Sequence, residues 1–181
     1  DVSVSGSSGV EYAGTVDVLD LNGRTLTVTG TVGGSDASGA LKGSATSSVV
    51  ASGAGAVGTV RFASGSEQLQ NLTVNRSGAG AGLTLGTPLT VSGTLALTSG
   101  VVGTGSNVLT VGASATVTRT SGFVQGNLKR SVALGAPSVT FPVGTGTVYA
   151  PAAVAFGTVS VAGTLTATTV APVARRSRVG I

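Results

Sequence analysis

Residues 83–97 read LTLGTPLTVSGTLAL, and this run indicates most of the architecture. It holds three triplets, at 83–85, 89–91 and 95–97, in which an apolar residue stands on each side of a small or polar one. This period of two is typical of a β-strand with one buried face, because successive side chains point to opposite sides of a strand. Gly, Pro, Ser and Thr between the triplets favour turns. We therefore expect short strands joined by tight turns.

The triplet recurs along the chain with a regular spacing. Further copies stand at 26–28, 72–74 and 109–111. Leu26, Val49, Leu72 and Leu95 are evenly spaced along the sequence. Their step of about 23 residues is typical of a solenoid of strands and turns, whose coils stack their apolar residues on one another. Leu83, Leu89 and Leu109 fall off this grid, so we expect them on other sides of the same coils.

Composition supports strands and opposes helices. Of 181 residues 41% are hydrophobic, mostly Val, Ala and Leu, 30 are glycine and 9% are charged. Low charge with high apolar content opposes intrinsic disorder, and no window has a 3.6-residue apolar period. Four of the six aromatic residues lie after residue 122, together with longer alternating runs such as 138–141 and 159–170. We predict an all-β chain: a right-handed parallel β-helix-like solenoid over 1–121, then a small β-sandwich-like module over 122–181, with essentially no α-helix. A β-sandwich throughout is the alternative.

Several short motifs occur in a fixed order along residues 60–155. They are NLTVN (71–75), GTLALTSG (93–100), LTVG (109–112), GFVQGNLKR (122–130), FPVG (141–144) and YAP (149–151). This order resembles the repetitive surface and secreted β-helix proteins of Bacteroidetes-type bacteria, many of which are exported by the type IX route. The resemblance implies an extracellular structural or adhesive role and brings no active-site residues with it.

The residues needed for common catalytic chemistry are missing. The chain has no His and no Cys, so neither a Ser-His-Asp triad nor a thiolate site can form. Asp17 and Asp20 are the only close pair of acids, and solvated turn residues explain them better than calcium ligands do. We expect no enzyme activity, no cofactor and no metal.

Three polar motifs have plain structural explanations. Thr25, Thr27, Thr29 and Thr31 alternate as on one strand, and a flat threonine array can bind ice or a sugar lattice. The array does not keep the even spacing of the leucine grid, because position 50 is Val, so an ordinary solvent face is favoured. The sequons at Asn71 and Asn75 arise readily in a Ser/Thr-rich chain. Residues 78–82 lack the Lys-Ser/Thr of a phosphate loop and fit a solenoid turn.

Charge divides the chain unevenly. Residues 1–67 hold six acids and three bases, net −3, whereas residues 68–181 hold seven bases and no acid, net +7. The bases are scattered and lack aromatic neighbours, which disfavours nucleic acid binding. A rod with one acidic and one basic end favours head-to-tail contact between copies. Arg175, Arg176 and Arg178 are the candidate basic contact.

The alternating N-terminal residues form a candidate assembly strand, made of Val2, Ser3, Val4 and Ser5. A solenoid has open β-edges at its ends, which invite strand addition by a neighbour. An ordinary first strand of a monomeric stalk explains the same residues equally well.

We expect a non-enzymatic, extracellular structural protein, a filament or surface-appendage subunit that binds copies of itself head to tail. The alternatives are a stalk or adhesin segment of a larger cell-surface protein and a module that binds ice or surface glycans. No run of 18 apolar residues occurs, so membrane insertion is not expected.

Overall fold

The structure, a computed structural model, describes residues 2–4, 10–11, 17–33 and 39–170, and every regular element in them is a β-strand. The strands in chain order are β1 (Val2–Val4), β2 (Val10–Glu11), β3 (Val18–Asp20), β4 (Thr25–Val28), β5 (Val32–Gly33), β6 (Ala40–Lys42), β7 (Ser48–Val60), β8 (Gln68–Leu85), β9 (Leu89–Ser99), β10 (Val101–Val111), β11 (Thr116–Arg119), β12 (Phe123–Val132), β13 (Ser138–Phe141), β14 (Gly144–Thr145), β15 (Val148–Tyr149), β16 (Ala152–Ala155) and β17 (Gly163–Thr168).

The first face of the solenoid, face A, carries the evenly spaced residues of the sequence repeat. It is built from β1, β4, the first halves of β7 and β8, the second half of β9, and β11, all paired in parallel. Leu26 lies opposite Val49, Val49 opposite Leu72, and Leu72 opposite Leu95. The register expected from the spacing is therefore confirmed, because equivalent residues of successive coils are neighbours on parallel strands.

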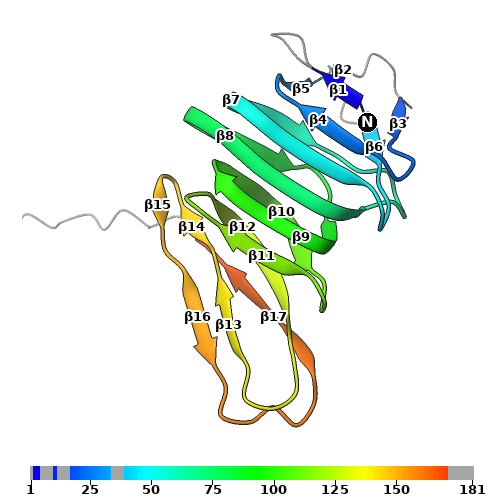
Figure 1. Cartoon of the computed structure of the whole chain (residues 1–181). Coiled ribbons are helices and arrows are strands. Elements are labelled where there is room, and N and C mark those ends of the chain that lie inside the picture. Colours follow the sequence, from blue (N-terminus) through cyan, green and yellow to red (C-terminus); the bar gives the residue numbers. More distant parts are fainter. Residues whose placement is uncertain (1, 5–9, 12–16, 34–38, 171–181) are drawn as a thin grey trace, which may run out of the picture.

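Two further faces complete each coil. Face B holds β2, β5, the later parts of β7 and β8, and the first residues of β10 and β12. Face C holds β3, β6, the first residues of β8 and β9, and the later parts of β10 and β12. Leu83 pairs with Val102 on face B, and Leu89 pairs with Leu109 on face C. The off-grid leucines thus lie on other sides of the same coils, and the chain forms a β-solenoid of about five turns (Figure 1).

The core is a stack of aliphatic side chains inside the coils. Leu72, Leu95 and Leu109 are at most 1% exposed, and they belong to one cluster that runs through the solenoid. Full burial of a Leu or Val stabilises a fold by about 1.5–3 kcal/mol. Because each rung contributes several such residues, the apolar stack is the main source of stability of the solenoid.

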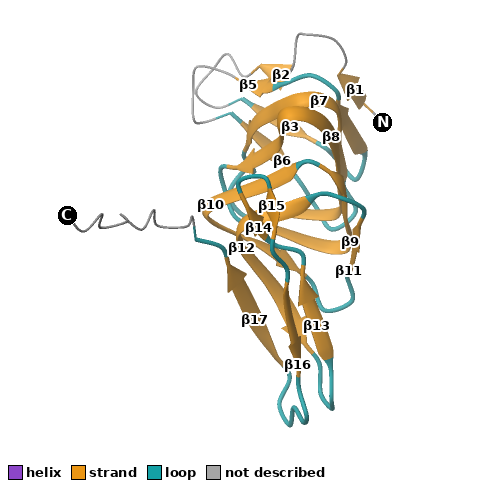
Figure 2. Ribbon diagram, turned by 90° about the vertical axis from the view of Figure 1, so that its left-hand side faces the viewer, coloured by secondary structure: helices purple, strands orange, loops and turns teal. Residues whose placement is uncertain are grey.

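The C-terminal module is a small pair of packed sheets. β12 pairs in parallel with β10, and its later residues pair antiparallel with β17. The β13–β16 pair is antiparallel, and its Val139 and Phe141 are buried in the common core, against which Leu165 and Ala167 also pack. This is the sandwich-like module expected after the solenoid, and it projects from the end opposite β1 (Figures 1 and 2). In the described part of the chain, no helix could cross a membrane.

Candidate functional site

Both ends of face A present a strand edge. Among the described residues, β1 pairs only with β4, and β11 pairs only with β9. At the C-terminal end the other two faces are covered, because Val143 bridges to Val124 on face B and β17 pairs with β12 on face C. Thr116 and Thr118 of β11 are exposed. Unpaired backbone groups on such an edge are a template for another strand.

The candidate assembly strand is only partly within the described residues. Val2, Ser3 and Val4 form β1, where they lie in register with Leu26, Thr27 and Val28. Within one chain β1 therefore serves as the first rung of face A, and one of its edges is left over. Ser5 and the candidate basic contact Arg175, Arg176 and Arg178 lie outside the described residues.

The described charged residues keep the division seen in the sequence. Asp17, Asp20 and Glu67 belong to the first three coils, whereas Arg119, Lys129 and Arg130 belong to the last one. The Arg119 guanidinium lies 3.4 Å above the centre of the Tyr149 ring, and the Arg119 Nε donates to the Gly122 carbonyl. Burial lowers the pKa of Arg130, and its Nη1 donates to the Thr140 carbonyl. Arg119 and Arg130 thus link the last coil to the C-terminal module.

Asp20 is engaged in an ion pair. Its Oδ2 accepts from the Lys42 Nζ at 2.9 Å, and its Oδ1 accepts from the Asn22 backbone N–H at 2.9 Å. These two hydrogen bonds lower the pKa of the Asp20 carboxyl group. In the described ranges, no three acidic side chains gather into a possible metal site. Both Asp20 oxygens are thus already used.

The outward side of face A is mostly polar, and in its central row threonine alternates with Val or Ala. This row consists of Thr27, Val50, Thr73, Ala96 and Thr118. The first two of the four alternating threonines lie on β4, but Thr29 and Thr31 lie beyond its end, because the chain turns there. A threonine array running in every coil is therefore absent from these five rungs.

The asparagines of the two sequons bond to neighbouring coils. The Asn71 Nδ2 donates to the Ser48 Oγ at 3.1 Å, and the Asn71 Oδ1 accepts from the Thr94 N–H at 2.9 Å. The Asn75 Oδ1 accepts from the Ser99 Oγ at 3.0 Å. Both side chains thus have a structural use as links between coils.

The corner between faces A and B differs in length from coil to coil. Each corner spans the chain from the same register row of face A to a paired residue at the start of face B. The step between these two residues is four at 97–101 and 119–123, but seven at 51–58 and eight at 74–82. The longer corners of β7 and β8 project beyond the shorter ones that follow. We call the projecting segments, residues 52–57 and 75–81, the corner arm.

Arg76 fills the inside of the corner arm. Its side chain is 1% exposed, and burial lowers its pKa. All three guanidinium nitrogens donate to backbone carbonyls, which are those of Thr29 (2.7 Å), Ser52, Ala54, Gly55 (3.0 Å) and Ala56 (3.4 Å). A buried carbonyl needs a hydrogen-bond donor, and four of these five carbonyls belong to the corner arm. Arg76 supplies these donors, so it allows the corner arm to exist.

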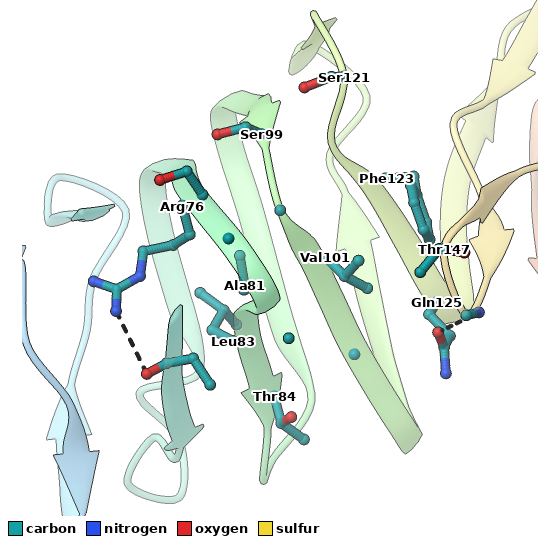
Figure 3. A pocket seen from close by; sticks show the side chains of 18 of the residues that line it. Arg76, Ala81, Leu83, Thr84, Ser99, Val101, Ser121, Phe123, Gln125 and Thr147 are labelled. Carbon is teal, nitrogen blue, oxygen red and sulfur yellow. Dashed lines mark hydrogen bonds between the residues drawn. The ribbon is translucent and has the colours of Figure 1, made fainter. Parts of the chain in front are cut away.

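A groove of about 590 Å³ lies beside the corner arm on the outside of face B. The arm with Ser77 and Ala81 forms one wall, and Val101 and Gly103 line the floor. The opposite wall comes from Phe123 and Gln125 of β12 and from Gly146 and Thr147 of the β14–β15 turn (Figure 3). We call this feature the corner groove.

A hydrogen bond and an aromatic contact hold the wall of the corner groove opposite the arm. The Gly146 N–H donates to the Gln125 Oε1 at 2.9 Å, which joins the β14–β15 turn to β12. The Phe123 and Tyr149 rings lie 6.4 Å apart, and Phe123 is 6% exposed. The wall is therefore a fixed part of the fold.

The sequence interpretation did not single out Arg76 or the corner groove. One signal was available, because Arg76 is the single charged residue between Glu67 and Arg119. A lone charge inside an apolar strand pattern suggests a buried, paired group. Nothing in the one-dimensional pattern indicates the groove, because it depends on a difference in corner length between coils.

Comparison with family models, with curated proteins and with solved structures found no match to this chain.

Proposed function

We propose that the protein is a non-enzymatic structural protein outside the cell, a subunit of a bacterial surface filament that assembles head to tail. The observation that carries the proposal is that β1 and β11, at opposite ends of the same parallel face, each have an edge without a partner strand among the described residues. The register row of face A that contains Leu26 runs from Val2 of β1 to Val117 of β11, with one residue from each coil. A second copy that places β1 beside β11 continues this row without changing its direction.

Charge supports the same orientation. The acids all lie between Asp1 and Glu67, and the end with β11 is basic. Opposite charges at the two ends favour head-to-tail encounter over contact between like ends, and salt weakens this preference. The extracellular location is part of the proposal and is supported by the resemblance to bacterial surface proteins.

A stalk or adhesin segment is the second candidate. The observation in its favour is that Val143 and β17 cover two of the three faces of the last coil, as expected for a capped end. In that case β11 would remain unpaired and the chain monomeric.

Sedimentation and negative-stain microscopy of the full chain separate the two candidates. The filament proposal expects polymers that shorten at high salt, and Thr118→Lys should abolish them, because a lysine on an edge strand opposes further pairing. Ser64→Lys adds the same charge at an exposed turn within the solenoid and should leave polymers intact. Discrete monomers at every concentration and salt level would reject the filament and favour the stalk.

A further inference from the structure

We propose that the corner groove is a binding site for the ring of a neutral pyranose sugar, seated above Gly103. This inference is independent of assembly, because the groove lies on the outer side of face B and uses neither β1 nor β11.

The seat is a gap in a row of side chains. Thr84, Gly103 and Gln125 are register partners on β8, β10 and β12. Neighbouring strands lie about 4.8 Å apart, so the Thr84 and Gln125 strands are separated by roughly 9–10 Å with no side chain between them. This opening is wide enough for one six-membered ring lying on the strand.

The fold does not require a glycine at position 103. Gly78 and Gly80 of the arm, and Gly82 directly after it, have φ values of 88°, 66° and 142°, which other residues rarely adopt. Gly103 has no such angle, and the nearest atom to a Cβ built there is the Thr84 Oγ1, at an ordinary 3.5 Å. Neither the backbone conformation nor side-chain packing therefore requires a glycine at position 103.

Unused hydrogen-bonding groups surround the seat. The Gln125 Oε1 accepts from Gly146, which orients the amide and leaves the Nε2 without a partner among the described residues. The Thr84 and Thr147 hydroxyls likewise have no partner in the described part of the chain. Hydroxyl and amide groups that both donate and accept match the hydroxyls of a sugar.

Charge argues for a neutral ligand. Among the described residues, Arg76 is the one charged residue that lines the corner groove, and each of its guanidinium nitrogens donates to a carbonyl of the arm. None of the described residues that line the groove carries a carboxylate either. An anionic or cationic ligand would lose hydration here without gaining an ion pair.

An added peptide strand fits less well than a sugar. The β8 segment that lines the groove has positive φ at Gly78 and Gly80 of the arm and at Gly82 directly after it. Strand addition needs N–H and C=O groups that alternate regularly along an extended edge, and these angles interrupt the alternation. The free side-chain hydroxyls and the amide are therefore the main recognition groups.

Saturation-transfer difference NMR tests the proposal on the full chain, and it works for a monomer and for a large assembly alike. The probes are the methyl glycosides of glucose, galactose, mannose and N-acetylglucosamine, with glucuronic acid and a Gly-Ala-Val peptide as contrasts. We expect saturable binding of at least one neutral glycoside at millimolar concentration, with glucuronic acid and the peptide weaker.

Two matched variants locate the site. Gly103→Val fills the seat and should weaken binding by about tenfold or more, whereas Gly163→Val makes the same change at a strand glycine with open space around it, on β17, and should leave binding unchanged. Circular dichroism confirms that both variants fold. Absence of saturable binding for all four glycosides, tighter binding of the acid or the peptide, or full binding by Gly103→Val would each overturn the proposal. None of these results depends on whether filaments form.

Discussion

The solenoid and the C-terminal module use the same few residue types but bury them to different extents. Leu95 and Leu109 in the solenoid are fully buried, whereas Leu134 and Val161 in the loops of the module are 63% and 80% exposed. A solenoid side chain is covered by the coils before and after it and by the opposite faces. Val139 and Phe141 of the module are buried where the β13–β16 pair packs on the common core, whereas Leu134 and Val161 stand in loops outside the strands. Burial here depends on the number of layers more than on composition.

The largest expected effect on stability comes from removing the buried charge of Arg76 inside the solenoid. Arg76→Met removes the donors of five carbonyls, and we expect the free energy of unfolding to fall by about 3–5 kcal/mol, because each buried carbonyl left without a donor costs about 1–3 kcal/mol. Urea denaturation measures this. Arg24 is exposed, and Arg24→Met should change stability by less than about 0.5 kcal/mol. Equal effects of the two variants would contradict the role given to Arg76.

The next effect compares equivalent truncations in the two regions. Leu95→Ala leaves a cavity between coils and should cost about 3 kcal/mol. Leu165 is only half-buried in the module, and Leu165→Ala should cost about 1 kcal/mol. Thermal unfolding of both variants measures the difference. A larger loss from Leu165→Ala would show that the module, not the solenoid, limits stability.

A smaller effect compares two strand glycines. A Cβ at Gly82 would lie 2.0 Å from the Val101 carbonyl oxygen, at a φ of 142°. Gly82→Ala should therefore destabilise the chain by about 2 kcal/mol. A Cβ at Gly163 meets nothing within 4 Å, so Gly163→Ala should be neutral or slightly stabilising. Denaturant midpoints report both, and the comparison fails if the two alanines behave alike.

The smallest effect concerns pH. The Lys42 and Asn22 hydrogen bonds hold the Asp20 pKa below its ordinary value of 3.8. A lowered folded-state pKa means that this contribution is present at neutral pH and is lost as pH falls through the lowered value. No charged residue occurs between Arg130 and Arg175, so acid should act on the solenoid first. Carboxyl NMR titration should show the Asp20 pKa rising in Lys42→Met, and an unchanged pKa would count against the ion pair.

Most of the fold was predictable because the spacing of apolar residues in the sequence sets the register of the paired strands. The even spacing of Leu26, Val49, Leu72 and Leu95 corresponds to the observed pairing, and the strand expected at 138–141 is β13. Periodic burial leaves a periodic sequence, so these elements were visible without coordinates.

The candidate site was not predictable in the same way. The corner groove arises because one corner is four residues longer than the next, and its seat is marked by the absence of a side chain at Gly103. In a chain with 30 glycines, one that is free of backbone strain cannot be told from those that need positive φ. Arg76 was visible as a lone charge, but its five partners come from coils 20 to 47 residues earlier.

The near-constant register from coil to coil has a consequence for how the protein holds together. Each coil couples to the coil before it and the coil after it, so stability is close to a sum over adjacent pairs. On face A, where the two strand edges lie, an end strand has one neighbour fewer than an inner one, so we expect its pairing to open first. A second copy placed on β1 or β11 would supply the missing neighbour, with the same kind of interface as one more turn of the chain. Adding a copy to a filament would then use the same kind of contact as packing one coil on the next within a chain. Any substitution that weakens the contact between adjacent coils would therefore weaken both the fold and the filament.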